Sequence, residues 1–233
     1  MEVQIGLFAA TIALTATARV FELRPSSRPS GGLFGSARDG LAALWSIVPL
    51  RAVSASSLFS VMGWGSLNVG FPAYAIAVNA GAHASGYLWA AVSVGSAVSA
   101  FAFARLAARL STVVLMAGSS LAMGCSALLW PLASDLPVAL VLVTLTGVLE
   151  GPALAAFFTV RQRFTPAHLR GQVFSTVGSV TLAGMAIGSA LAGPVHAALG
   201  TDATLLAFAA FQFASAACLL PARAVLRGTE AHA

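Results

Sequence analysis

Charged side chains are scarce in this sequence, and lysine is missing altogether. Only 8% of the 233 residues are charged, and the twelve basic residues are all arginines. Soluble domains carry about 25% charged residues, so this chain has too few charges to cover a surface that faces water. The scarcity excludes an ordinary cytosolic enzyme. Because 58% of the residues are hydrophobic and the mean hydropathy is +0.90, the composition also excludes a disordered chain.

Cysteine and histidine are too few and too scattered to build a reactive site. The two cysteines, Cys125 and Cys218, each lie in an apolar stretch, where a small buried residue is expected. No cluster has the spacing of metal ligands, and no glycine-rich phosphate loop or nucleophile–base pair occurs. The sequence therefore predicts no enzyme activity, no metal and no cofactor. The net charge of +5 would elsewhere suggest nucleic acid, but the arginine positions given below predict no such partner.

Long apolar stretches are abundant, and they predict a membrane protein. A helix needs about 20 mostly apolar residues to cross the hydrocarbon core of a bilayer. We therefore expect the all-α fold class, as a polytopic membrane helix bundle surrounded by lipid. Seven stretches have about this length: 3–21, 53–79, 85–104, 112–131, 137–160, 171–195 and 203–221.

The first stretch is the weakest, and two interpretations of it are open. Residues 16–18, Ala-Thr-Ala, resemble a signal-peptide cleavage site. A signal peptide carries positive charge before its apolar core, whereas here Glu2 precedes the stretch and Arg19 follows it. We favour a retained membrane anchor with its N-terminus outside.

The arginines predict how the chain is oriented in the membrane, because positively charged loops stay in the cytoplasm. All twelve follow the first, third, fifth or seventh stretch, and the alternate connections hold none. We therefore expect seven spans in the plasma membrane (a bacterial inner membrane), with the N-terminus outside and the C-terminus inside. The arginines are Arg19, Arg24, Arg28, Arg38, Arg51, Arg105, Arg109, Arg161, Arg163, Arg170, Arg223 and Arg227.

The same stretches divide the chain into four parts. Residues 1–23 form the first span, and residues 24–51 form a cytoplasmic linker rich in proline, serine and glycine. Residues 52–222 form a six-helix bundle, and residues 223–233 form a cytoplasmic tail. Within the linker, apolar residues of 37–50 recur at offsets of three and four, as in a short amphipathic helix on the membrane surface. An extension of the next span explains them equally well.

Glu150 is the ionisable residue inside a span. A charge at mid-bilayer costs about 2.5–3.5 kcal/mol on insertion scales, so such residues face a bundle interior or an aqueous cavity. Thr146 and Phe157 share its helix face, and we expect all three residues to line a cavity. Proton or cation coupling is the role that we favour for Glu150; direct substrate contact and a structural hydrogen bond are the alternatives.

A polar stripe in the second span predicts another cavity wall. Ser57, Ser60, Trp64, Asn68 and Phe71 recur at intervals of three or four residues and so lie on one side of a helix. Substrate contact is one interpretation of Asn68, and a hydrogen bond across a helix contact is the other.

Small residues predict close helix contacts in the fifth and sixth spans, because they let another backbone approach. A proline in a span bends its helix. Contacts within this chain and contacts with a partner are equally compatible with the sixth span. The residues concerned are Gly147, Gly151 and Pro152 in the fifth span, and Gly184, Gly188 and Gly193 in the sixth.

Two loops resemble cytoplasmic loops of the major facilitator superfamily. Residues 165–174, Thr-Pro-Ala-His-Leu-Arg-Gly-Gln-Val-Phe, resemble the loop before the family's eleventh helix. Residues 104–111 resemble the G-x-L-A-D-R-x-G loop between its eighth and ninth helices. Leu106, Ala107 and Arg109 match that motif, whereas its acidic position is an alanine here, which removes a gating charge.

The resemblance covers about residues 37–222 and is nearest to the bacterial drug and macrolide efflux branch. It implies that the seven expected spans correspond to the family's sixth to twelfth helices. The family's seventh and tenth helices line the transport cavity, so the resemblance places Asn68 and Glu150 there. The family's first five helices have no counterpart in this sequence, and a substrate site of this family lies between two halves.

Two hypotheses of function follow from this resemblance. The first is a half or truncated membrane transporter, an antiporter for proton-coupled efflux of a small amphipathic molecule, completed by a missing N-terminal half or a second copy. The second is a non-transporting remnant or accessory subunit that pairs with another helical half. A seven-helix receptor is suggested only by the number and orientation of the spans. In the first hypothesis the topology and a cytoplasmic gate depend on Arg105, Arg109, Arg161, Arg163 and Arg170.

Overall fold

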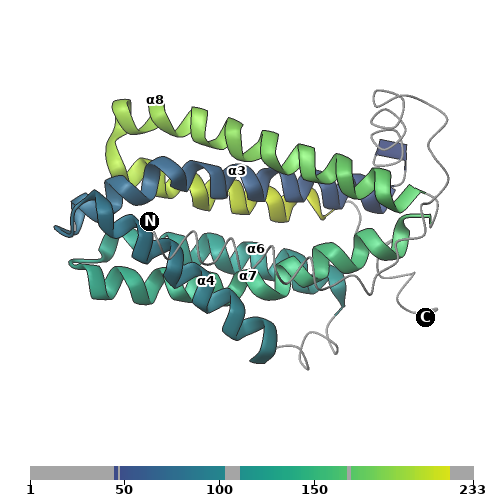
Figure 1. Ribbon diagram of the computed structural model, residues 1–233, viewed down its shortest axis with the longest axis horizontal. Coiled ribbons are helices and arrows are strands. Elements are labelled where there is room, and N and C mark those ends of the chain that lie inside the picture. Colours follow the sequence, from purple (N-terminus) through teal and green to yellow (C-terminus); the bar gives the residue numbers. More distant parts are fainter. Residues whose placement is uncertain (1–44, 47, 103–110, 167–168, 221–233) are drawn as a thin grey trace, which may run out of the picture. The chain divides into compact units, whose positions relative to one another are not determined.

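The computed structural model describes residues 45–46, 48–102, 111–166 and 169–220, and all regular elements among these residues are helices (Figure 1). Three segments of this part are long and apolar enough to cross a membrane: 112–132, 136–164 and 170–218. The helices are α3 (Val48–Ala77), η1 (Ala82–Ala84), α4 (Ser85–Ala102), α6 (Thr112–Ala127), η2 (Trp130–Leu132), α7 (Leu136–Phe164) and α8 (Arg170–Cys218).

Helix starts follow local sequence signals. The Ser111 hydroxyl accepts a hydrogen bond from the backbone N–H of Val114 at 3.4 Å and begins α6. Asp135 does the same for α7, with its carboxylate 3.0 Å from the N–H of Val138. Such N-caps satisfy donors that have no partner in the first helical turn. They place the starts of α6 and α7 within a residue of the starts expected from hydropathy.

The N-terminal part of α3 is longer than the apolar stretch that predicts it. The helix begins at Val48 rather than at residue 53, and Arg51 lies in its first turn. Residues 48–50 of the expected amphipathic helix are therefore an extension of the span. The rest of that helix, except residues 45 and 46, lies outside the described residues, as do the expected first span, the cytoplasmic tail, Arg105 and Arg109.

The sixth and seventh expected spans form one element, α8, that is interrupted at Gly200. Its backbone there has φ 83° and ψ −171°, which is not helical. A φ in this range is costly for residues with a Cβ atom. The chain reverses at this glycine, as the turn of the α8 ribbon shows in Figure 1, so α8 has two antiparallel arms.

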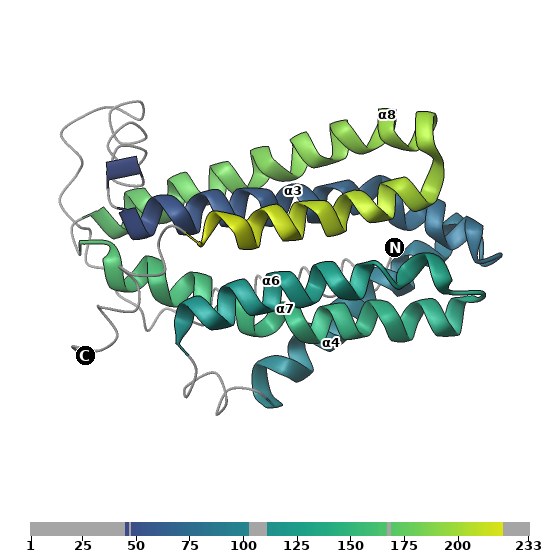
Figure 2. The same ribbon diagram turned by 180° about the vertical axis from the view of Figure 1, so that it is seen from behind.

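The helices pack in two main pairs. α3 packs along α8, and α4 packs along α7, while α6 contacts α7 and α8. Figure 2, seen from behind, shows α3 beside both arms of α8 and α6 beside α7. Apolar side chains from all of these helices form the main core. Hydroxyl groups add bonds between helices, such as Ser56 to Ser215 at 2.9 Å and Ser126 to Thr146 at 2.8 Å.

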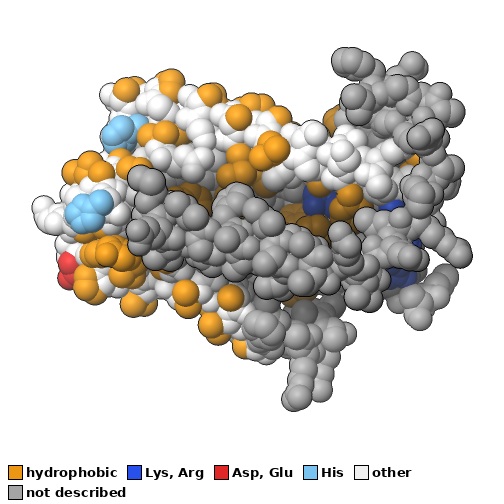
Figure 3. Space-filling view, in the orientation of Figure 1, with side chains coloured by type: hydrophobic (Ala, Val, Ile, Leu, Met, Phe, Trp, Pro, Cys, Tyr) orange, Lys and Arg blue, Asp and Glu red, His pale blue; other side chains and the backbone are white. Residues whose placement is uncertain are grey.

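Apart from Glu150, the charged side chains and histidines of the described residues gather at the two ends of the bundle. Figure 3 shows basic side chains towards one end, and histidine and acidic side chains at the other. This separation agrees with the arginine pattern of the sequence, while the side of the membrane that each end faces stays a prediction. We call the first end the arginine end, with Arg51, Arg161, Arg163 and Arg170; the opposite end holds His83, Asp135, His196 and Asp202.

Candidate functional site

A central cavity of about 500 Å³ lies between α3, α6, α7 and α8. Its wall combines one carboxylate, one guanidinium, three hydroxyls and four aromatic rings with aliphatic side chains. An apolar wall with a few polar groups is typical of small-molecule sites. The polar and aromatic lining residues are Ser57, Ser60, Trp64, Glu150, Phe157, Phe158, Arg161, Phe174 and Thr181.

Glu150 is the middle residue of α7, so each end of this helix is about 21 Å away at 1.5 Å per residue. It lines the central cavity and also a side cavity of about 600 Å³, whose other lining residues include Trp64, Trp89 and Ser96. Ser96 of α4 lines the side cavity beside this carboxyl group. Glu150 therefore lies at the junction of two cavities in the middle of the bundle.

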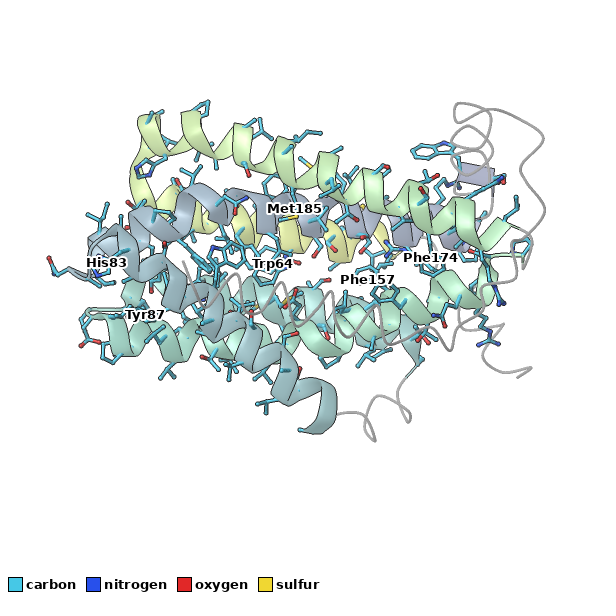
Figure 4. All side chains as sticks on the ribbon, in the orientation of Figure 1. Trp64, His83, Tyr87, Phe157, Phe174 and Met185 are labelled. Carbon is cyan, nitrogen blue, oxygen red and sulfur yellow. The ribbon has the colours of Figure 1, made fainter. Side chains whose placement is uncertain are left out.

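Three other residues of the expected cavity wall lie on the central cavity. Ser60 lines it while donating a hydrogen bond to Oε1 of Gln212, at 3.2 Å, on the second arm of α8. Trp64 and Phe157 contribute rings from α3 and α7. In Figure 4, Phe157 and Phe174 lie near the arginine end, and Trp64 lies further along the bundle. The cavity thus extends from the arginine end to the depth of Glu150.

Asn68, Phe71 and Thr146 do not lie among the lining residues of this cavity. The Asn68 amide donates to the Ser189 hydroxyl at 3.0 Å, between α3 and α8. Phe71 is fully buried. Thr146 is buried too and bonds to Ser126 of α6. The structure places these three side chains in helix contacts.

An aromatic cluster lies between the central cavity and the opposite end of the bundle. Phe71 packs edge-on against Trp89, with ring centroids 5.0 Å apart, and Trp130 stacks on Phe208 at 5.2 Å. Trp64 joins the cluster by an edge contact with Phe208 at 5.0 Å. The five rings come from α3, α4, η2 and α8 and fill the bundle between Trp64 and η2.

The arginines of the predicted gate differ in their surroundings. Arg163 and Arg170 are exposed at the arginine end. Arg161, in the last turn of α7, is only 5% exposed and lines the central cavity. Its guanidinium carbon lies 5.8 Å from the centroid of the Phe157 ring. Arg161 is therefore part of the cavity wall, in addition to marking one end of the chain's spans.

Glycines produce two close helix crossings. A Cβ atom on Gly188 of α8 would overlap the Met62 carbonyl oxygen of α3, and one on Gly65 of α3 would overlap the Met185 carbonyl oxygen of α8. Gly184 faces α3 in the same way, with Val61 Cγ2 2.7 Å from such an atom. These contacts lie within the chain.

The second crossing joins α4 and α7. Gly147 lies against the backbone of Val92, and Gly95 lies against the backbone of Thr144. Gly151 is buried in the same helix, whereas a Cβ atom on Gly193 of α8 would meet no atom within 4 Å. Small residues thus fix α7 against α4 at the level of Glu150.

Comparison with known proteins identifies the family. Residues 53–232 match the Major Facilitator Superfamily. The chain belongs to this superfamily. The membership confirms the expected resemblance, and with it an all-α helix bundle in a membrane.

Named relatives in the superfamily are efflux pumps and transporters, not enzymes. The multidrug efflux pump Tap of Mycobacterium tuberculosis (strain ATCC 25618 / H37Rv) is 31% identical over 185 residues, which are 79% of this chain and 44% of that protein. Tap of Mycolicibacterium fortuitum is 32% identical over 122 residues, 52% of this chain and 30% of that protein.

A third relative is the uncharacterized MFS-type transporter y4rN of Sinorhizobium fredii (strain NBRC 101917 / NGR234). It is 33% identical over 159 residues, 63% of this chain and 37% of that protein. The chain thus spans less than half the length of the curated relatives that it matches. No solved structure gave a significant match.

Two parts of the candidate site were not among the residues predicted from the sequence. Ser96 faces Glu150, and its signal was the recurrence of Ser93, Ser96 and Ser99 at intervals of three residues on α4. Trp130 and Phe208 complete the aromatic cluster without a pattern of their own. Among the described residues, no group of three His, Cys, Asp or Glu side chains could hold a metal ion.

Proposed function

We propose that the chain is part of a membrane efflux transporter in which Glu150 takes up and releases a proton. The observation that carries this proposal is the position of Glu150, which lies at the middle of α7 and on the walls of two cavities. Proton relays in transporters are built from carboxylates at this depth of the membrane. The efflux-pump relatives support the same class of function.

The surroundings of Glu150 suit a change of charge. Ser96, which lies beside it, is a neutral group, and no ion pair of Glu150 occurs in the described part of the chain. An ionised carboxylate at this depth lacks a counter-charge and depends on water or a bound cation. Ionisation of Glu150 is therefore coupled to what occupies the cavities.

The central cavity suits a small amphipathic substrate. Its rings, Trp64, Phe157 and Phe174, offer apolar and stacking contacts, while Ser57 and Glu150 offer polar ones. Leu154 and Leu182 line it too and are 48% and 71% exposed. We propose that a second helical half, from another chain segment or a second copy, covers this exposed side.

The arginine end faces the cytoplasm in this proposal, because positively charged loops are retained there. The membrane is the plasma membrane, in which efflux moves a molecule out of the cell. The alternative, a non-transporting remnant or accessory subunit, would dock on a partner through the sixth span. Gly184 and Gly188 offer it no support, since α3 already occupies their faces.

Transport by the wild-type protein and Glu150→Gln tests the proposal. Inverted membrane vesicles are prepared from bacteria that express each protein. Uptake of the fluorescent zwitterion norfloxacin into the vesicles is then followed with and without an imposed pH gradient. We expect Glu150→Gln to lose acceleration by the gradient, because an amide cannot ionise. Asp135→Asn is the matched control, since Asp135 is an exposed carboxylate at the end of the same helix. Unchanged gradient-driven uptake in Glu150→Gln would refute the proton role.

A further inference from the structure

Arg161 is a buried cation whose side chain is not fully bonded. It is 5% exposed, and its Nε atom is buried without a hydrogen-bond partner. The Phe157 ring is close to the guanidinium, at 5.8 Å. A ring face compensates a buried charge only in part, and an unpaired buried ion is destabilising. Such a group calls for a further partner, such as an ion or a ligand.

No carboxylate of the described residues can neutralise Arg161. Asp135 and Asp202 lie at the opposite end of the bundle. Glu150 is three helical turns away along α7, or about 16 Å at 1.5 Å per residue. The guanidinium therefore faces the cavities with its charge uncompensated in this part of the chain.

A second donor without a partner lies beside the same space. Arg161 also lines a pocket of about 250 Å³ between α3 and α8, which we call the α3–α8 pocket. Ser54 of α3 lines this pocket, and its buried hydroxyl has no hydrogen-bond partner. Thr181, also in the wall, already donates to the Val177 carbonyl at 2.9 Å. Two unused donors from two helices thus meet one pocket.

Apart from Ser57, the remaining wall of the α3–α8 pocket is apolar. Leu58 and Val61 of α3 and Val180 of α8 form its sides. Arg161 lies in the last turn of α7, near the depth at which a lipid bilayer changes from hydrocarbon to head groups. A pocket with polar groups at one end and apolar sides is complementary to an amphipathic molecule.

We propose that Arg161 and Ser54 form an anion-binding subsite, which holds the carboxylate or phosphate head group of an amphipathic molecule whose apolar chain lies in the α3–α8 pocket. The planar guanidinium matches the two oxygens of such a group, and the Ser54 hydroxyl adds a third donor. Binding at this subsite does not require that the chain transports anything, so the outcome of the Glu150→Gln experiment leaves it unaffected.

Binding of a fluorescent fatty acid tests the subsite directly. The purified chain in phosphatidylcholine nanodiscs is titrated with 11-(dansylamino)undecanoic acid and, in parallel, with its uncharged methyl ester. We expect the acid to bind more tightly than the ester, and Arg161→Gln to weaken the acid by about 10- to 100-fold, as for loss of a charged hydrogen-bond partner. Arg163→Gln, the same change on an exposed residue two positions along, is expected to leave its affinity within about twofold.

A second variant and a competitor separate the remaining explanations. Ser54→Ala changes no charge and should weaken the acid by about 2- to 10-fold. Dodecyl phosphate should compete with the acid, whereas inorganic phosphate at the same concentration should not, because it cannot use the apolar walls. The proposal is overturned if Arg161→Gln and Ser54→Ala bind the acid as wild type does, and Arg161 then pairs with a carboxylate of another helical half. Equal weakening by Arg163→Gln would also overturn it, since binding would then reflect surface charge.

Discussion

Replacing Gly188 by alanine tests the crossing of α3 and α8, the larger helix pair of the bundle. A Cβ atom at this position would lie 2.7 Å from the Met62 carbonyl carbon, and closer still to its oxygen. Ordinary contacts begin near 3.4 Å, so the two backbones must separate by roughly 1 Å. Overpacking of this kind costs about 1–3 kcal/mol. At roughly 2–4 °C per kcal/mol for a chain of this size, we expect Gly188→Ala to lower the melting temperature by roughly 2–12 °C.

Thermal unfolding in detergent, followed by tryptophan fluorescence, measures this change because Trp64 and Trp130 lie in the core. Gly118→Ala on α6 is the control, since Gly118 is an exposed helical residue with no atom within 4 Å of the added Cβ. It should melt at or slightly above the wild-type temperature, because alanine is the better helix former by about 0.5–1 kcal/mol.

A double variant makes the prediction sharper. Gly65 belongs to the same crossing as Gly188, whereas Gly147 belongs to the crossing of α4 and α7. Once α3 and α8 have separated, alanine at Gly65 should cost little more, while the cost of Gly147→Ala should add to that of Gly188→Ala. If Gly188→Ala melts at the wild-type temperature, the close approach of the two backbones does not exist in the folded protein, and the argument fails.

Two further predictions concern single hydrogen bonds. Tyr74→Phe removes the 2.7 Å hydrogen bond from the Tyr74 hydroxyl to the Trp130 carbonyl. Because that carbonyl still accepts a hydrogen bond from the N–H of Ala133, we expect the free energy of unfolding, measured by chemical denaturation, to fall by only about 0.5–1.5 kcal/mol. A fall of more than about 3 kcal/mol would show that the position of the ring had changed too. Asp135→Ala removes the N-cap of α7 and should lower the free energy of unfolding by about 0.5–2 kcal/mol, whereas Asp135→Asn should retain most of the stability. Equal losses of stability in both variants would mean that Asp135 contributes through its charge and not through capping.

Hydropathy predicted the positions of α3, α4, α6 and α7 because it follows from single residues and their neighbours in the chain. It also separated the two arms of α8, since Gly200 and the polar residues around it break the apolar run. The start of α3 at Val48 was less predictable. Pro49 and Arg51 interrupt the apolar run at residues 48–52, and burial of Leu50 with Val173 and Val177 of α8 accompanies their helical state.

The candidate site was partly predictable. Glu150 was predictable because a carboxylate within a membrane span has a high free energy of insertion. Its neighbour Ser96 did not, since serine is common in membrane helices and only the packing of α4 on α7 brings this one to the carboxyl group. The stripe of α3 was divided in the same way: Ser60 and Trp64 lie on the central cavity, while Asn68 bonds to Ser189 and Phe71 packs on Trp89.

The sequence alone determined that this chain is a helical membrane protein whose arginines all follow alternate apolar stretches, because the transfer of each side chain into lipid depends on that side chain. Only the tertiary structure decided which polar groups meet. Whether Arg161 lies in water or within a wall, and whether Gly188 meets lipid or Met62, depends on the crossing of helices that are distant in sequence. Periodicity gives the direction of a side chain on its helix, but the partner that it meets is fixed by packing between helices.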